Sequence, residues 1–267
     1  MDHCPKRIVC LTEETTETLY LLGEEERIVG ISGFTVRPKG VRQEKQIVST
    51  FTHASYEEII ALSPDLVIGF SDIQAEIAEK LIRRGITVWI NNYRSISGIY
   101  QMIYQLGSLV GKSKEANALI SGYQSKIEHI QSEVKQWSVQ PKVYFEEWYD
   151  PIISGIKWVS EIVQICGGID LFHHLSEESL AKDRIIKDAQ EVVDSNPDIV
   201  LVSWCGKMFK PKRMFERFHW KSIKAFQTDD YYEIPSSVIL QPGPAALSDG
   251  IDQIHGIFKQ WVLKQQT

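Results

Sequence analysis

Two pairs of neighbouring carboxyl groups are the side chains of this sequence best suited to acid–base chemistry. Glu13–Glu14 and Glu146–Glu147 each follow a short apolar run that is typical of a buried strand. Adjacent carboxyl groups can serve as an acid and a base when their surroundings separate their pKa values. Glutamates at strand ends also cap helices and accept hydrogen bonds from ligand amides, and the sequence favours this binding or capping role.

Other signatures of catalysis or metal binding are missing from the sequence. It holds no GxGxxG, Walker, GxSxG or HExxH motif. Its four cysteines, Cys4, Cys10, Cys166 and Cys205, form no CxxC pair, so no structural metal is expected. His53 lies near a predicted strand-end loop, where an exposed side chain is favoured over an axial ligand to cobalt or iron. We therefore expect a binding protein without catalytic residues, not an enzyme.

Aromatic side chains recur where the predicted strands end. Ligands of open parallel α/β sheets bind beyond the carboxyl ends of the strands. Aromatic rings at these positions offer broad, rigid faces that suit a large planar ligand. Trp158, which begins a predicted helix, could cover such a ligand or pack beneath it. The candidate ligand-binding residues are Glu13, Glu14, Phe34, Phe51, Phe70, Ser71, Tyr93, Glu147, Trp148, Tyr149, Trp158, Trp204, Cys205 and Gln241.

An internal repeat indicates how these residues are positioned. The segment Glu58–Ser71 is matched by Glu191–Trp204, and each copy has a helical pattern, a Pro-Asp pair and a continuous apolar run. The residue before a proline disfavours the helical conformation, so each helix is expected to end there. A continuous apolar run is typical of a parallel strand buried on both faces. The repeat therefore predicts two lobes built on one plan.

Strands alternate with helices in both lobes, which predicts an α/β fold with mostly parallel, Rossmann-like sheets. The first lobe has predicted strands Arg7–Leu11, Arg27–Ile31, Leu66–Phe70 and Thr87–Asn91, and helices Glu14–Leu22, Tyr56–Leu62 and Ala75–Arg84. The second lobe has strands Lys142–Glu147 and Tyr232–Ile234, and helices Trp158–Cys166 and Pro244–Trp261.

Helical periodicity over Ser95–Leu109 and Lys114–Trp137 predicts a helical connection between the lobes. The expected division is an N-terminal lobe over 1–95, an inter-lobe helical linker over 96–137 and a C-terminal lobe over 138–267. One long helix would join the two lobes.

The composition of the chain limits the classes of partner that it can bind. A formal charge of −6 argues against nucleic acid, which requires a basic face. The cluster Lys207, Lys210, Lys212 and Arg213 is expected to be a solvated loop and helix start. No apolar run approaches the roughly 20 residues that span a bilayer. The N-terminus shows no leader, so a cytoplasmic monomer is expected, or a periplasmic or cell-surface protein whose leader was removed.

Several segments together resemble the vitamin B12-binding and iron-siderophore-binding proteins of ABC importers. They are Pro5–Thr12, Val29–Ser32, Glu58–Ile68, Gly85–Val88 and Val163–Gly168, and the resemblance covers nearly the whole chain. It implies a solute-binding protein that holds a corrinoid such as cobalamin, as bound ligand, in the cleft between two lobes joined by one helix.

The same resemblance leaves alternatives for the ligand and the partner. A ferric siderophore or haem is one, although an acidic, Arg-poor pocket would suit anionic chelates less well. A salvage enzyme that uses the cleft carboxylates is another. The resemblance also implies docking to an ABC permease through one surface glutamate on each lobe. Glu76 matches the first of these, whereas Val238–Pro244 offers no acidic residue for the second.

Overall fold

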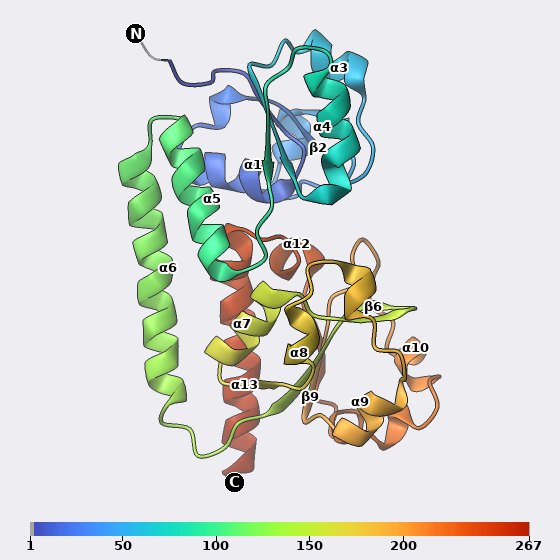
Figure 1. The fold of residues 1–267 in the computed structure, drawn as a ribbon. Coiled ribbons are helices and arrows are strands. Elements are labelled where there is room, and N and C mark those ends of the chain that lie inside the picture. Colours follow the sequence, from blue (N-terminus) through green and yellow to red (C-terminus); the bar gives the residue numbers. More distant parts are fainter. Residues whose placement is uncertain (1–2, 267) are drawn as a thin grey trace. The chain divides into compact units, whose positions relative to one another are not determined.

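The computed structural model describes residues 3–266, which form two compact units (Figure 1). The first unit comprises the described part of 1–93 together with 97–122 and 241–245. The second comprises 94–96, 123–240 and the described part of 246–267. Helix α5 (Ile96–Leu109) lies almost wholly in the first unit, and α6 (Ser113–Val134) begins in the first and ends in the second. The helical segments expected as a separate linker are thus divided between the units.

The first unit contains a five-stranded sheet in the order β3-β2-β1-β4-β5, with every neighbouring pair parallel. The chain order reverses direction between β1 and β4, which is where ligands of such sheets bind. The strands are β1 (Ile8–Cys10), β2 (Ile28–Ser32), β3 (Gln46–Ser49), β4 (Leu66–Phe70) and β5 (Val88–Asn91), and the early helices are α1 (Glu13–Leu21), α2 (Val41–Glu44), α3 (Tyr56–Ala61) and α4 (Ala75–Ile82).

Alternation along β1 sends side chains to two different layers of the first unit. Val9 packs with Ile59 of α3 and Leu81 of α4 in one buried cluster. Ile8 and Cys10 are equally buried and point to the opposite face. In Figure 1, α3 and α4 lie together on one side of the sheet, and α1 lies on the other. The sheet is therefore covered on both faces, as its continuous apolar strands predict.

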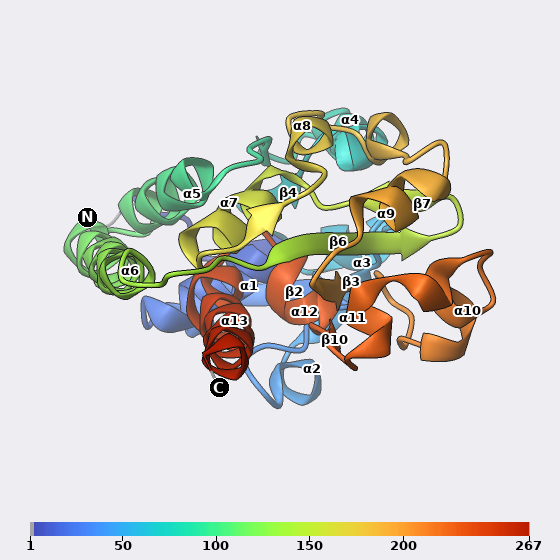
Figure 2. The ribbon, with the colours of Figure 1, turned by 90° about the horizontal axis from the view of Figure 1, so that it is seen from below.

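The second unit contains the strand order β10-β9-β6-β7, with β8 also paired to β6. All pairs are parallel except β6 with β7. Helices α7 and α13 pack beside each other (Figures 1 and 2). The strands are β6 (Lys142–Tyr149), β7 (Ile152–Ser154), β8 (Ile169–Asp170), β9 (Ile199–Val202) and β10 (Tyr231–Glu233), and the helices are α7 (Lys157–Ile165), α8 (His173–Ser176), α9 (Gln190–Ser195), α10 (Pro211–Phe215), α11 (Lys224–Gln227), α12 (Ser236–Ile239) and α13 (Ile251–Gln265).

The repeat seen in the sequence is present in both units. Helices α3 and α9 each end before a Pro-Asp pair that leads into the central strands β4 and β9. Ser63 and Asn196, which precede the two prolines, both adopt left-handed backbone angles, with φ of 47° and 45°. This conformation ends each helix sharply. The predicted α/β fold with mostly parallel sheets in both lobes is confirmed, and each sheet has five strands.

The aspartate of each repeat anchors the first strand of its unit. The Asp65 carboxylate accepts hydrogen bonds from the backbone N–H groups of Lys6 and Arg7, at 2.7 and 3.0 Å, just before β1. The Asp198 carboxylate accepts one from the N–H of Lys142 at 2.9 Å, at the start of β6. Equivalent side chains thus fix equivalent strands.

Helical structure near the C-terminus begins at Pro244, as expected, and passes through a π-helical turn at Ala246–Gly250 before α13. None of the helices in residues 3–266 combines the length and the apolar character needed to span a membrane.

Candidate functional site

The carboxyl end of β1 leads almost directly into α1, which brings three glutamates to the topological switch point of the first sheet. Only Leu11 and Thr12 separate the strand from the helix. Glu13, Glu14 and Glu17 are 7%, 1% and 9% exposed, so all three carboxyl groups are largely removed from water. Burial disfavours the charged form of a carboxyl group.

Glu13 and Glu14 have raised pKa values. Burial, and then the nearby Glu14, raise the pKa of Glu13 to about 8. Burial also raises the pKa of Glu14 to about 7, although Glu14 accepts a 2.6 Å hydrogen bond from the Thr12 hydroxyl. The Glu13 Oε2 atom has no hydrogen-bond partner among residues 3–266. Near neutral pH both groups are to a large extent protonated, so each can donate a hydrogen bond as well as accept one.

Glu17 is held differently, although sequence reasoning did not single it out. It accepts a 2.7 Å hydrogen bond from the Arg37 guanidinium and a 3.1 Å hydrogen bond from the Ala245 N–H. This carboxylate therefore ties α1 to two distant segments of its own unit. Its position four residues after Glu13, on the same helix face, was the signal in the sequence.

The remaining candidates of the first unit differ in accessibility. Phe70 and Tyr93 form an edge-to-face pair with ring centres 5.5 Å apart. Phe34 is 47% exposed, and Phe51 is half-buried. Gln241, on the segment that returns to this unit, is 9% exposed. Aromatic rings therefore lie at or just after the carboxyl ends of β2, β3, β4 and β5.

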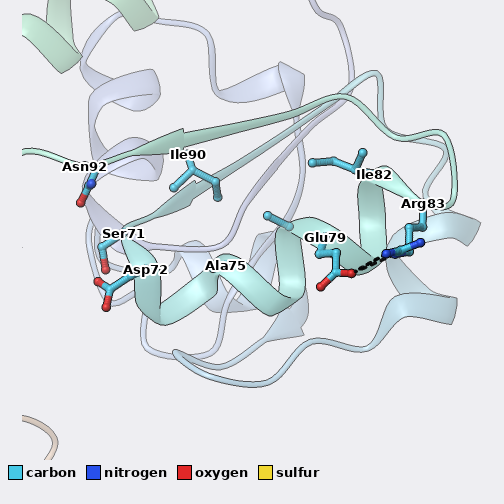
Figure 3. Close-up of a pocket in the computed structure, with 9 residues that line it drawn as sticks. Ser71, Asp72, Ala75, Glu79, Ile82, Arg83, Ile90 and Asn92 are labelled. Atoms are coloured by element: carbon cyan, nitrogen blue, oxygen red, sulfur yellow. Dashed lines mark hydrogen bonds and ion pairs between the residues drawn. The ribbon is translucent and has the colours of Figure 1, made fainter.

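Ser71, at the end of β4, borders a pocket on the outer side of α4. Its φ of 58° is left-handed, and its hydroxyl accepts a hydrogen bond from the Ile73 N–H. The pocket has a volume of about 620 Å³ and runs between α4 and the edge strand β5. Its wall carries the Glu79–Arg83 ion pair, and Ser71 is the only candidate residue that lines it (Figure 3).

Glu146 and Glu147, the neighbouring carboxylates of the second unit, are both engaged in ion pairs. Glu146 is 0% exposed and accepts hydrogen bonds from the Arg217 guanidinium at 2.5 and 3.2 Å. It also accepts from the Tyr144 hydroxyl at 2.7 Å and the Trp204 indole at 3.0 Å. Glu147 pairs with both terminal nitrogens of Arg184, at 2.6 and 3.1 Å. Glu146 and Glu147 therefore stabilise the fold through ion pairs and do not contribute a free acid or base.

Three aromatic residues gather at the ends of β6 and β9. The ring centre of Tyr149 lies 5.4 Å from that of Trp148 and 4.9 Å from that of Trp204. Trp204 is buried, whereas the other two rings are half-buried. The predicted strand ends at Glu147, but β6 continues to Tyr149 because its last residues pair with β7. Trp148 and Tyr149 are thus fixed in a strand and not on a loop.

A pocket of about 310 Å³ opens beside these rings. Its lining residues are Tyr149, Trp204, Lys207, Met208, Lys210 and Arg213. The Lys207 ammonium lies 4.5 Å from the centre of the Trp148 ring, and the Arg213 guanidinium lies 4.6 Å from that of Tyr149. The basic cluster does occupy an exposed loop and the start of α10. Three of its four members nevertheless line this pocket, which is therefore basic.

The other candidates of the second unit lie elsewhere. Trp158, the second residue of α7, is 3% exposed, and its indole N–H donates to the Ile239 carbonyl at 2.8 Å. Its ring packs in the core of its unit. Cys205 is an exposed cysteine, and His53 is an exposed loop residue whose Nδ1 lies 2.9 Å from the Thr52 hydroxyl. In the described part of the chain, no three His, Cys, Asp or Glu side chains are placed to hold a metal ion.

The model of the family described as "Periplasmic binding protein" matches residues 8–238. The chain belongs to this family. Its members are binding proteins and not enzymes, so the expectations of a binding protein and of the family resemblance are both confirmed.

Individual relatives share the fold but carry different names. An uncharacterized ABC transporter substrate-binding lipoprotein of Bacillus subtilis is 25% identical over 94% of this chain and 79% of its own length. A vitamin B12-binding protein of Vibrio campbellii is 27% identical over 74% of this chain and 70% of its own length. The crystal structure of a periplasmic haem-binding protein from Pseudomonas aeruginosa superposes with a TM-score of 0.82 at 16% identity, covering 95% of this chain and 92% of that one. The shared fold therefore does not determine the ligand.

Proposed function

We propose that this solute-binding protein of the ABC-importer type binds a corrinoid such as cobalamin through the strand-end side chains of its two units. The observation that carries the proposal is the cluster of Trp148, Tyr149 and Trp204 beside the 310 Å³ pocket. A corrin ring is a broad disc, and rigid aromatic faces can contact it over a large area with little loss of conformational entropy. The vitamin B12-binding relative supports the same ligand class.

The glutamates of the first unit suit the periphery of a corrinoid. The corrin ring bears primary amides, each of which has a carbonyl that accepts and an NH₂ group that donates hydrogen bonds. A protonated carboxyl group can satisfy both partners, whereas a carboxylate can only accept. Burial keeps Glu13 and Glu14 to a large extent protonated near neutral pH. The unpartnered Oε2 of Glu13 is an atom that a ligand amide would satisfy.

Haem is the second candidate, and the cations around the pocket are the observation that favours it. Haem is also a planar macrocycle, and its two propionates are anionic. Lys207, Lys210 and Arg213 offer the complementary charge. A ferric siderophore with anionic chelating groups would meet the same cations, but it lacks the flat macrocycle that the rings suit.

Calorimetric titration of the purified chain with cyanocobalamin, haemin and a ferric catecholate siderophore tests the proposal. We expect one corrinoid site per chain with a dissociation constant in the micromolar range or tighter, about −8 kcal/mol. Tyr149→Ala should weaken binding by roughly tenfold or more, as truncation of a buried aromatic anchor does. Glu76→Gln is the control, since this side chain is 88% exposed. Saturable haem binding without corrinoid binding would identify haem as the ligand in place of a corrinoid. No binding of any of the three compounds would overturn the proposal.

A permease partner follows from the importer class. Glu76 lies in the first turn of α4 and is exposed apart from a 3.8 Å ion pair with Lys80, so we propose it as a docking residue. Glu76→Arg should reduce ligand uptake by cells without changing ligand affinity. The proposal also places the working chain outside the cytoplasmic membrane, with a cytoplasmic carrier as the alternative, and cell fractionation distinguishes the two.

A further inference from the structure

Three cations around the aromatic pocket have no carboxylate partner in the described part of the chain. Lys207, Lys210 and Arg213 form no ion pair with any residue between 3 and 266. Two other arginines of the same unit show the contrast. Arg217 is neutralised by Glu146, and Arg184 by Glu147. The positive charge of the pocket is therefore not part of the ion-pair network that holds the unit together.

The aromatic rings hold these cations without neutralising them. Lys207 lies over both Trp148 and Tyr149, at 4.5 and 5.3 Å from the ring centres, and Arg213 lies over Tyr149 at 4.6 Å. A cation over an aromatic face is attracted by the ring but keeps its charge. Positive charges that gather in a concave pocket attract an anion from solution. In a chain whose net charge is −6, such a cluster is a local exception.

The chemistry of the pocket specifies the group that fits it. Lysine and arginine donate charge-assisted hydrogen bonds to phosphate and carboxylate oxygens. The Tyr149 and Trp204 rings beside them offer an apolar surface to a ring system attached to that anion. Cobalamin carries one phosphate diester, in the nucleotide loop that joins its corrin ring to an aromatic base.

We propose that this pocket is a subsite for the phosphate diester of the ligand's nucleotide loop, with Lys207, Lys210 and Arg213 as its charge partners. The inference rests on the proposed corrinoid function and adds to it a reason for selectivity. The chain distinguishes a complete cobalamin from a corrinoid that lacks the nucleotide loop.

Comparing cyanocobalamin with cobinamide tests the subsite, because cobinamide keeps the corrin ring and lacks the nucleotide loop with its phosphate. Calorimetric titration of the unaltered chain should give at least about a tenfold preference for cyanocobalamin, the ratio that one charge-assisted hydrogen bond supplies. Raising the salt concentration should reduce this preference. In Lys207→Gln/Lys210→Gln/Arg213→Gln the preference should fall to within about threefold while cobinamide affinity is kept, which also shows that the variant is folded.

A matched triple variant controls for the change in net charge. Lys182→Gln/Lys187→Gln/Lys221→Gln removes three exposed cations of the same unit that do not line the pocket, and it should keep the full preference. Equal binding of the two corrinoids by the unaltered chain, or a preference that survives in the pocket variant, overturns the subsite and leaves the corrinoid function intact. A pocket variant that loses only haemin binding also overturns it and assigns the cations to a carboxylate. If neither corrinoid binds, the proposed function itself fails.

Discussion

Each unit carries a pair of neighbouring glutamates, just after β1 in the first unit and within β6 in the second, and the two pairs have opposite environments. Glu13 and Glu14 are buried without an ion-pair partner among residues 3–266, and their pKa values are raised. Glu146 and Glu147 each bind an arginine. The comparison shows that neighbouring carboxyl groups do not define a role by themselves. Their role depends on whether a cation pairs with them, and that cation comes from a distant part of the chain.

The largest expected effect is a loss of stability when an ion-paired glutamate of the second unit is replaced. Glu146→Gln removes the charge that neutralises Arg217 in a site where the glutamate is 0% exposed. Leaving one partner of a buried ion pair uncompensated should cost about 3–5 kcal/mol of unfolding free energy, measured by urea denaturation at pH 7. The exposed Glu76→Gln is the control and should change stability by less than about 0.5 kcal/mol. A loss below about 1 kcal/mol for Glu146→Gln would mean that this ion pair does not anchor the unit.

The same glutamate-to-glutamine change in the first unit should have the opposite effect on the free energy of unfolding. With a folded-state pKa of about 8 against an ordinary 4.5, Glu13 keeps a proton between these values that the unfolded chain has released. Its contribution to stability therefore falls as pH rises from 4.5 to 8. Glu13→Gln cannot ionise, so it should match the unaltered chain at pH 4 and be more stable at pH 8.5, by on the order of a few kcal/mol. Urea denaturation at the two pH values measures this.

Glu147→Gln is the matched control for that experiment, because it removes a glutamate whose partner is Arg184. It should destabilise the chain at pH 8.5. If Glu13→Gln and Glu147→Gln both stabilise or both destabilise the chain at pH 8.5, the assignment of different environments to the two glutamate pairs is contradicted.

Ligand affinity should follow the protonation of the first pair. If the Glu13 and Glu14 carboxyl groups donate hydrogen bonds to ligand amides, binding should weaken between pH 6 and 9, as groups with pKa values of about 7 and 8 lose their protons. We expect a loss of roughly three- to tenfold in calorimetric titrations with cyanocobalamin. Glu13→Gln/Glu14→Gln should give a flat profile. A profile of unchanged slope in the double variant would assign the pH dependence to other groups.

The smallest expected effect on stability concerns the two aspartates of the internal repeat. Asp65→Asn and Asp198→Asn should each cost about 1–2 kcal/mol of unfolding free energy, because each carboxylate accepts charge-assisted hydrogen bonds at the start of a central strand. Thermal unfolding under one set of conditions compares them. Effects confined to one of the two variants would show that only one copy of the repeat anchors its strand.

Local sequence patterns predicted most of the secondary structure. The run Leu66–Phe70 is a strand with the expected bounds because it is apolar throughout and follows a proline that ends the preceding helix. No bounds were predicted for strand β3, although Phe51 was expected at a strand end, since Gln46 and Ile47 are exposed at the edge of the sheet and leave only two buried residues as a signal. The extension of β6 to Tyr149 depends on pairing with β7, which no pattern within β6 reveals.

The candidate site was less predictable because its character depends on residues far apart in the sequence. Arg217 lies 71 residues from its partner Glu146, so the engagement of that glutamate has no local signal. Trp158 has the sequence context of a site residue, but its N–H is satisfied by a carbonyl 81 residues away. By contrast, Lys207, Lys210 and Arg213 recur at intervals of three residues directly after β9. That spacing after a central strand was a usable signal for a charged pocket.

A competition between two macrocycles tests the central claim most directly. The chain is mixed with equal excesses of cyanocobalamin and haemin and passed through a gel-filtration column, and the visible spectrum of the protein peak identifies the retained ligand. The proposal predicts the corrinoid spectrum at about one molecule per chain. A haem spectrum, or a protein peak without either ligand, would contradict it.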